Sequence, residues 1–310
     1  MTYEELAREW DSDSDFIVCR TSGSTGSPKQ IRLPKKQMLR SAERTARYFS
    51  LDAGSELHSC ISPDYIGGKM MLVRERFLGC RLSWETPSNR PLESYEGNEI
   101  DLLSIVPSQM IYILDNLGSM PRIKNILIGG APVSPTLRER IVSSGLNVFE
   151  SYGMTETSSH IAIRKIGKEV SPFTTLEGIT VSNPDGRLCI NIRDWMEITT
   201  NDLAEVSNPN EFHILGRADN VINSGGKKIH PESVEMRLEK HLDNSYRFYI
   251  SSRPDEKWGE AVILVTEAPP DSKAEIIEVC RKILDKHEIP KEIVFKDKIE
   301  LTPNGKIRRN

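Results

Sequence analysis

Two lysine-containing turns carry residue types suited to phosphate chemistry. The first follows an apolar run and reads Thr21, Ser22, Gly23, Ser24, Thr25, Gly26, Ser27, Pro28 and Lys29. Its glycines free backbone N–H groups to turn inward and its hydroxyls add donors, so it can wrap phosphate oxygens. It differs from a Walker A loop, which needs a glycine where this chain has Pro28. The second turn ends in Lys306, whose long ammonium side chain can reach into a cleft. Taken alone, these segments would be a surface turn and a solvated tail.

The elements that must position these turns are predicted to form an α/β layer fold. From Phe16 to Phe149, short aliphatic or β-branched runs alternate with stretches of helical period, and the runs FIVC, CISP, LLSIV, NILIG and LNVF are predicted strands. A helix is predicted from Pro135, with Ser134 as N-cap and Gly145 after its end. Between about Leu188 and Leu215, strand pieces separated by Asn, Asp and Pro predict a twisted β-ribbon region.

The pattern changes again after Gly216, to a compact α+β unit. Pro231 opens a helix, two strands and a second helix follow, and the last strand is EIVF. A chain of 310 residues is long enough for about two domains. We therefore predict a large α/β domain with a β-ribbon region over residues 1–218, and a small α+β lid domain over residues 219–310.

The composition excludes several classes of protein. With 37% hydrophobic and 28% charged residues the chain is neither disordered nor of low complexity. A net charge of -4 argues against nucleic acid as the main partner. The five cysteines form no CxxC pair and no short Cys/His grouping typical of zinc sites, which indicates reduced thiols. No signal peptide and no membrane span is recognisable, so we expect a cytoplasmic protein.

Six segments in order along the chain together resemble the adenylate-forming superfamily of acyl- and aryl-CoA synthetases. The matching segments are the phosphate loop from Thr21, GGAP (129–132), SYGMTET (151–157), TNDLAEV (200–206), GRADNVINSGGKKIHPESVE (216–235) and TPNGKIRRN (302–310). The resemblance implies an enzyme that activates a carboxylic acid with ATP and Mg²⁺ and transfers the acyl group to coenzyme A.

The resemblance also implies roles for the matched positions. An acid attacking an anionic α-phosphate needs cations and donors aimed at the charge that develops. Thr155 is expected to hydrogen-bond the α-phosphate and Glu156 to hold Mg²⁺. Tyr152 is expected to stack on adenine, while Asp202 and Arg217 bind the ribose. The other expected nucleotide-binding residues are Thr21, Ser22, Gly23, Ser24, Thr25, Gly26, Lys29, Gly130, Ala131, Pro132 and Gly153.

Two half-reactions are implied for the one site. Asp219 matches the hinge about which the small domain of the family rotates, and Lys306 matches the catalytic lysine of the first, adenylating step. In the second step the pantetheine arm of CoA is expected to pass the segment Ser224, Gly225 and Gly226. Lys227 and Lys228 either contact CoA phosphates or form a solvated surface.

The acid pocket is expected near the segment SPDYIGGKMMLVRERFLG (62–79). Tyr65 takes the place that histidine or another aromatic residue holds in the family, and His160 either lines the same pocket or is a structural histidine. Lys69 lies in the first turn of a helix, where the dipole disfavours a cation. It is either an exposed surface lysine or the partner of a second carboxylate on the substrate. The segment resembles o-succinylbenzoate-CoA ligases of menaquinone synthesis, whose acid is dicarboxylic.

This chain departs from the family pattern in three places. Asn201 replaces the glycine of the TGDL motif, and Asn223 stands where many relatives have lysine. Only twenty residues precede the phosphate loop, so part of the acyl or CoA channel is expected to be absent or supplied by another copy in a homo-oligomer. We predict an o-succinylbenzoate-CoA ligase. The alternatives are a ligase for another acid, a carrier-loading enzyme, and a nucleotide-binding regulatory module without turnover.

Overall fold

The computed structural model describes residues 1–20, 30–243, 245–301 and 307–309. Two compact units make up the chain. The first contains Met1–Val133, Leu137–Thr180 and Ile192–Met196, and the second contains Ser134–Thr136, Val181–Asn191 and Glu197–Asn310. The predicted phosphate loop, Thr21 to Lys29, and Lys306 lie outside the described residues.

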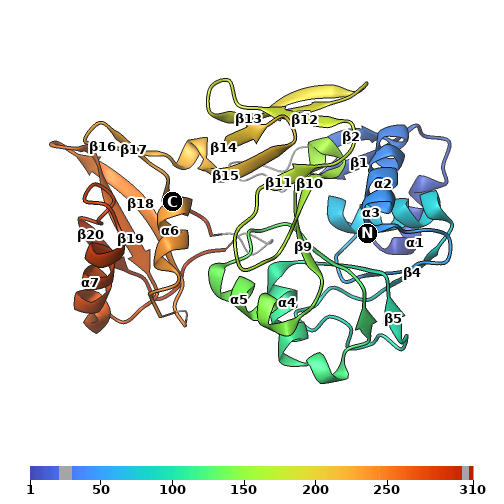
Figure 1. The fold of residues 1–310 in the computed structure, drawn as a ribbon, viewed down its shortest axis with the longest axis horizontal. Helices are drawn as coiled ribbons and strands as arrows, with labels where there is room; N and C mark the ends of the chain where they lie inside the picture. The colour runs from blue at the N-terminus through green and yellow to red at the C-terminus, as the bar shows by residue number, and fades with distance from the viewer. Residues whose placement is uncertain (21–29, 244, 302–306, 310) are drawn as a thin grey trace. The chain divides into compact units, whose positions relative to one another are not determined.

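The first unit is a layered α/β structure (Figure 1). Its elements are α1 (Tyr3–Trp10), β1 (Phe16–Arg20), β2 (Gln30–Pro34), α2 (Lys35–Phe49), β3 (Glu56–Ser59), α3 (Ile66–Leu78), β4 (Arg81–Trp84), β5 (Glu99–Ile100), β6 (Leu102–Ile105), α4 (Pro107–Asp115), β7 (Arg122–Ile123), β8 (Ile126–Ile128), most of α5 (Pro135–Ser144), β9 (Val148–Met154), β10 (Ser159–Lys165) and β11 (Phe173–Thr175). The main sheet runs in the order β11-β10-β9-β8-β6-β3-β4. The strands from β9 to β4 are parallel, whereas β10 and β11 are antiparallel to their neighbours.

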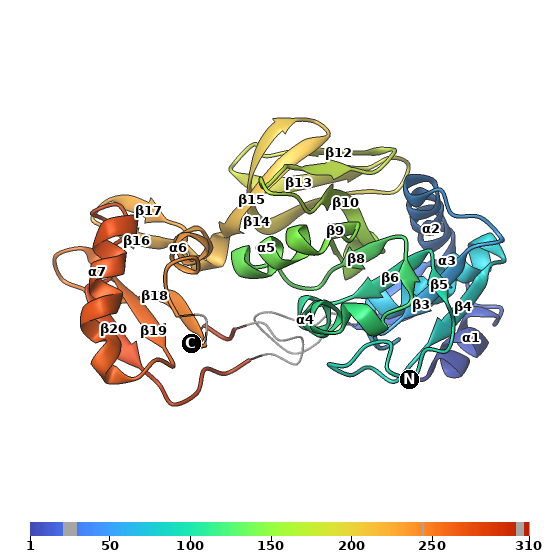
Figure 2. The same cartoon turned by 60° about the horizontal axis from the view of Figure 1, so that its bottom comes forward.

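Helices cover both faces of this sheet, with α2 and α3 on one side and α4 and α5 on the other (Figure 2). The apolar side chains on the α4 and α5 side form one core with β6 and β8, which includes Met110, Leu137 and Ile141. A second core joins α2 and α3 to α1 and to the β1–β2 hairpin, and includes Leu6 and Met38. Burial of apolar residues on both faces explains why the parallel strands read as continuous hydrophobic runs.

Local sequence signals placed several elements of this unit correctly. Helix α5 begins at Pro135 as predicted, and Gly145 after its end has φ +72°, the left-handed conformation that favours glycine. Strands β1, β6, β8 and β9 coincide with predicted apolar runs. The run that begins at Cys60 does not, because its strand, β3, has ended at Ser59.

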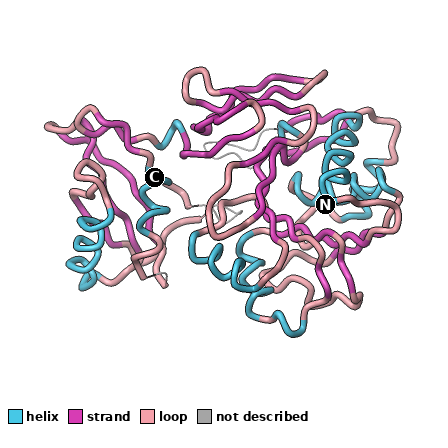
Figure 3. The backbone as a smooth tube through the Cα atoms, in the orientation of Figure 1, coloured by secondary structure: helices cyan, strands magenta, loops and turns pink. Residues whose placement is uncertain are grey.

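The second unit contains the β-ribbon region and the C-terminal α+β part. The ribbon is a run of strands in the order β12-β13-β14-β15, of which β14 and β15 pair antiparallel, and it is drawn in magenta in Figure 3. Its strands are β12 (Ile179–Ser182), β13 (Arg187–Ile192), β14 (Met196–Asn208) and β15 (Glu211–Arg217). The C-terminal part contains β16 (Ile222–Ser224), β17 (Lys227–Ile229), α6 (Pro231–Leu238), β18 (Phe248–Asp255), β19 (Gly259–Thr266), α7 (Lys273–Ile283) and β20 (Glu292–Phe295).

The C-terminal part is built on a sheet of order β17-β16-β19-β18, with β20 beside β19. Val234 of α6 and Cys280 of α7 pack with Ile250 and Leu264 of the sheet in one core. Tyr249 and Ile299 belong to a separate small cluster with Ile307. The α/β class, the β-ribbon region and the C-terminal α+β part are therefore confirmed, while the domain boundary at Asp219 stays a prediction. No helix among the described residues has the length and apolarity needed to cross a membrane.

Candidate active site

A tight turn between β9 and β10 presents Thr155 and Glu156. The two residues lie in a short 3-10 helix, Thr155–Thr157, and both are half-buried. Thr157 holds the turn from inside: its hydroxyl accepts a hydrogen bond from the Met154 amide at 3.1 Å and donates to the Ser159 carbonyl at 2.7 Å. A hydroxyl that ties both ends of the turn fixes the directions of the two preceding side chains.

Gly153 allows the two strands that carry this turn to approach closely. A Cβ atom at Gly153 would lie only 2.2 Å from the Ser159 carbonyl oxygen and 2.4 Å from the His160 Cα. Any other residue would push β10 away from β9 and displace the turn. The preceding Tyr152 ring lies 5.8 Å from the ring of Phe173 on β11.

The segment Gly129–Pro132 follows β8, next to β9 in the sheet. Gly130 has φ +86°, and a hydrogen bond from the Gly129 amide to the Ile105 carbonyl, at 3.1 Å, fixes the start of the segment. Its end is fixed by the buried Glu150 of β9, which accepts a hydrogen bond from the Val133 amide at 3.2 Å. Ala131 and Pro132 lie between these anchors, at the carboxyl edge of the parallel strands, where ligands of α/β sheets bind.

The predicted ribose residues lie together in the second unit. Asp202 of β14 and Arg217 of β15 face each other across the antiparallel pair. The Arg217 Nη1 donates to Asp202 Oδ1 at 2.9 Å, and the Asp202 side chain is only 14% exposed. The guanidinium orients the Asp202 carboxylate, and the role of the two residues at the ribose stays a prediction.

The predicted hinge residue contacts this pair. Asp219 lies in a short 3-10 helix, Ala218–Asn220, and its carboxylate accepts a hydrogen bond from the Asn201 side-chain amide. It also lies 3.8 Å from Arg217 Nη2. Asn201 departs from the family glycine, and it adds a side-chain link from the ribose segment to the hinge segment that glycine could not make.

The expected CoA segment contains a buried and an exposed part. Ser224 is buried, whereas Gly225, Gly226, Lys227 and Lys228 are exposed. Gly225 has φ +57°, and a Cβ atom there would lie 2.6 Å from the Trp258 ring. The conformation of this turn therefore depends on glycine, and a large residue at Gly225 would disturb Trp258 as well as any ligand path.

The structure corrects one of the two interpretations of Lys69. Lys69 is 2% exposed, so it is not a surface lysine. Its Nζ lies 3.0 Å from the Met1 sulfur, and it packs in the first turn of α3, just after the half-exposed Tyr65. Burial lowers the pKa of its ammonium.

Arg74, one turn further along α3, is a candidate functional residue that sequence reasoning missed. It is fully buried, pairs with no carboxylate among the described residues, and its Nε has no hydrogen-bond partner there. Its Nη1 contacts the Met71 sulfur at 3.2 Å, and burial lowers the pKa of the guanidinium to about 10. A buried cation without a carboxylate partner is unusual, which makes Arg74 a candidate binding group for an anion.

The positive charge of Arg74 acts on the side chain of His160. It is buried, with its Nε2 3.1 Å from the Thr45 hydroxyl and its Nδ1 3.5 Å from the Ser159 hydroxyl. Burial and the positive charge of Arg74 lower its pKa well below the usual value, so the imidazole is neutral. Its place in the acid pocket stays a prediction.

Comparison with known families agrees with this geometry. Residues 3–190 match the family described as AMP-binding enzyme, and residues 249–306 match the family described as AMP-binding enzyme C-terminal domain. The chain belongs to the AMP-binding enzyme family. Together with its relatives, this makes the chain an AMP-forming acyl-CoA synthetase.

Individual relatives of this AMP-binding enzyme include ligases of one kind. The 2-succinylbenzoate–CoA ligase of Enterococcus faecalis is 25% identical, over all of this chain and 71% of its own length. The structure of the Bacillus subtilis o-succinylbenzoate CoA synthetase with its acyl-adenylate intermediate has a TM-score of 0.81 and 25% identity, over 94% of this chain and 68% of that one. An acyl-CoA synthetase-like protein from Dyadobacter fermentans is 34% identical, with a TM-score of 0.65, over 98% of this chain and 91% of its own.

Proposed function

We propose that this AMP-binding enzyme converts o-succinylbenzoate to o-succinylbenzoyl-CoA. Two lines of support point to this acid. Relatives that match the whole chain are named as ligases of 2-succinylbenzoate. The buried Arg74 offers a cation to a substrate that carries a second carboxylate beyond the one that reacts.

In the first half-reaction the substrate carboxylate attacks the α-phosphate of ATP and pyrophosphate leaves. Thr155 donates to the α-phosphate, and Glu156, a half-buried carboxylate on a rigid turn, holds Mg²⁺. Asp202, oriented by Arg217, accepts the ribose hydroxyls. Lys306 supplies the positive charge that stabilises the developing negative charge in the transition state.

In the second half-reaction the CoA thiol attacks the acyl carbon of the adenylate and AMP leaves. The small domain, which we place after a hinge at Asp219, turns so that Ser224, Gly225 and Gly226 line the pantetheine path. A role for Lys227 and Lys228 at the CoA phosphates fits their exposure.

The observation that carries the choice of acid is Arg74, a buried arginine with an unpartnered Nε in the helix that follows Tyr65. A charge-assisted hydrogen bond contributes about 1.5–3 kcal/mol. Arg74 is therefore expected to favour o-succinylbenzoate over a monocarboxylic analogue by about 10- to 100-fold. We propose Arg74 for this role ahead of Lys69, because an arginine binds a carboxylate with two parallel hydrogen bonds.

The test is acid-dependent exchange of labelled pyrophosphate into ATP by the purified chain. Exchange is measured with o-succinylbenzoate, benzoate, a fatty acid and an amino acid. Exchange with o-succinylbenzoate alone supports the proposal. Exchange with a different acid would refute the substrate and keep the chemistry, and ATP binding without exchange with any acid would favour the regulatory module.

The role of Arg74 is tested with a matched pair of variants in α3. Arg74→Lys should raise the KM for o-succinylbenzoate by about 10- to 100-fold and leave the KM for ATP unchanged. The control is Arg76→Lys, two residues along the same helix, where the arginine contacts Asp11 and Glu75 near the surface. Equal effects of the two variants would remove Arg74 from the acid pocket.

We also propose a cytoplasmic location, because the reaction consumes ATP and CoA, and a homo-oligomeric state. The mass of the purified chain in solution, measured by light scattering with and without ATP, tests the oligomer. A monomer of full activity would refute it.

A further inference from the structure

A buried group of three potential metal ligands lies in the first unit, apart from Thr155 and Glu156. His58 belongs to β3, Cys60 follows that strand directly, and Glu85 follows β4. Strands β3 and β4 are parallel neighbours in register, with Ser59 opposite Trp84, so their carboxyl ends meet at one edge. The His58 ring nitrogen, the Cys60 sulfur and a Glu85 carboxylate oxygen all lie within 4.8 Å of one another.

The burial of the group leaves one polar atom without a partner. His58 is 2% exposed and Cys60 is 1% exposed, and the Glu85 side chain is 6% exposed. The His58 Nε2 makes no hydrogen bond to any described residue, and it points toward Glu85 Oε2, 4.0 Å away. A buried ring nitrogen without a partner is costly, and a metal ion between the three side chains would satisfy it.

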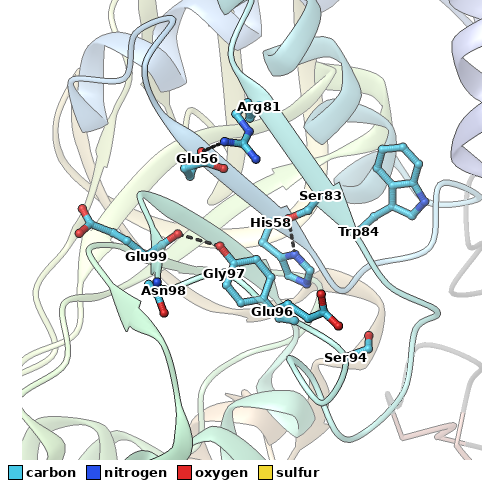
Figure 4. Close-up of a pocket in the computed structure, with 11 residues that line it drawn as sticks. Glu56, His58, Arg81, Ser83, Trp84, Ser94, Glu96, Gly97, Asn98 and Glu99 are labelled. Carbon is cyan, nitrogen blue, oxygen red and sulfur yellow. Dashed lines mark hydrogen bonds and ion pairs between the residues drawn. The ribbon is translucent and has the colours of Figure 1, made fainter.

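Neighbouring hydroxyl and amide groups already orient two of the three side chains. Figure 4 shows the Ser83 side chain beside the His58 ring, where Ser83 Oγ lies 2.8 Å from Nδ1 and leaves Nε2 for a ligand. The Glu85 carboxylate accepts hydrogen bonds from the Leu92 amide at 2.7 Å and from Ser94 Oγ at 3.2 Å. Metal-binding histidines and carboxylates in proteins are held in this way.

The donor set selects the metal. One imidazole nitrogen, one thiolate sulfur and one carboxylate oxygen suit a borderline ion such as Zn²⁺, whereas Mg²⁺ prefers oxygen ligands alone. Ligands of a tetrahedral zinc ion lie roughly 3.3–3.6 Å apart, so the three atoms would have to close by about 1 Å. His58, Ser83 and Ser94 also line a cavity of about 480 Å³.

We propose that His58, Cys60 and Glu85 bind one zinc ion, which ties the end of β3 to the end of β4. The expectation from sequence excluded the short Cys/His groupings of zinc sites. That expectation did not consider Glu85, which lies 25 positions after Cys60 and 27 after His58. The parallel pairing of β3 and β4 brings it beside them.

Cobalt substitution in the full chain tests the site directly. Co²⁺ added to the metal-free wild-type protein should give a thiolate-to-cobalt charge-transfer band, which zinc then removes by displacement. Cys60→Ser should lose this band while Cys19→Ser keeps it, because Cys19 is a buried free thiol of the same unit outside the group. No band with wild type, or a band that Cys60→Ser retains, would overturn the proposal.

A second measurement does not depend on removing a ligand. Ser83→Ala leaves all three ligands in place and removes the hydroxyl that orients His58. It should weaken zinc affinity by about 10- to 100-fold. Unchanged affinity in Ser83→Ala together with one tightly bound zinc would place the metal elsewhere and overturn the assignment to His58.

Discussion

Two arginines of this chain, Arg309 partly buried and Arg74 fully buried, have opposite surroundings. Arg309, near the end of the second unit, donates to both carboxylate oxygens of Glu235 in α6, at 2.5 and 2.6 Å, and to the Ile250 carbonyl at 2.8 Å. Arg74, in α3 of the first unit, contacts a methionine sulfur and has no carboxylate partner among the described residues. The chain therefore neutralises one buried cation and leaves the other uncompensated.

The difference separates an anchor from a binding group. A buried charge that is paired and hydrogen-bonded holds two segments together. Removing one partner destabilises the protein, because the other charge stays buried without compensation. An unpaired buried cation costs free energy in the empty protein and recovers it when an anion binds. Arg309 thus fixes the residues that follow Lys306, whereas we propose that Arg74 gains its partner from the substrate.

The largest expected effect comes from the tail that Arg309 anchors. Lys306→Ala should slow adenylation by about 10²–10³-fold or more, because it removes a charge that acts in the transition state. Thioester formation from supplied acyl-adenylate should remain largely intact. Pyrophosphate exchange and CoA ligation from the adenylate are measured separately, and equal losses in both would assign Lys306 to structure rather than chemistry.

Breaking the paired cation should have the next largest effect, on stability. Glu235→Gln removes the carboxylate that hydrogen-bonds Arg309, leaves only the more distant Glu232, 3.9 Å away, and should lower the free energy of unfolding by about 2–3 kcal/mol. This is below the 3–5 kcal/mol of a fully buried pair, because the two side chains keep 18% and 19% exposure. The measurement is the free energy of unfolding from urea denaturation, taken from the transition in which the second unit unfolds.

The control for this prediction is an exposed ion pair of the same unit. Glu292 pairs with Arg253 at 2.8 Å, but about half of each side chain is exposed. Glu292→Gln should change stability by less than about 1 kcal/mol. If it destabilises the protein as much as Glu235→Gln does, pairing of Arg309 is not what anchors the tail.

Local signals in the sequence were enough for several elements, but not for the burial of the cations. Pro135 and Gly145 delimit α5 through backbone preferences that neighbouring residues decide. Lys69 and Arg74 lie on one helix whose environment is supplied by distant segments, since α3 packs against α1 and β10. No periodicity in the helix itself distinguishes a buried arginine from a surface one.

The same reasoning covers the site residues. Motif resemblance identified Asp202 and Arg217, and the structure joins them through a strand pair. His58 and Cys60 lie two residues apart in the sequence, but only strand register brings Glu85 beside them, so the sequence alone did not reveal the group. The burial of the two cations and the position of Glu85 were not predicted, because both depend on contacts between distant parts of the chain.

The effect of Arg74 on the pKa of His160 should appear in how stability changes as the pH is lowered. Burial and Arg74 lower the pKa of His160 well below its unfolded value of about 6.5. Below pH 6.5 the unfolded chain therefore binds a proton that the folded chain does not, and stability falls by at most about 1.4 kcal/mol per pH unit. His160→Gln should reduce this slope between pH 6.5 and 5.5 in urea denaturation, and His241→Gln, at an exposed position, should not.

The smallest expected effect is the stability change on removing Arg74. Arg74→Met replaces an uncompensated buried charge with an apolar side chain of similar length, so the free energy of unfolding at pH 7.5 should fall by less than about 1 kcal/mol or should rise. The acid slope should become shallower, because the positive charge that helps to lower the pKa of His160 is gone. A loss as large as that of Glu235→Gln would mean that Arg74 is paired in the folded protein, and the comparison between anchor and binding group would fail.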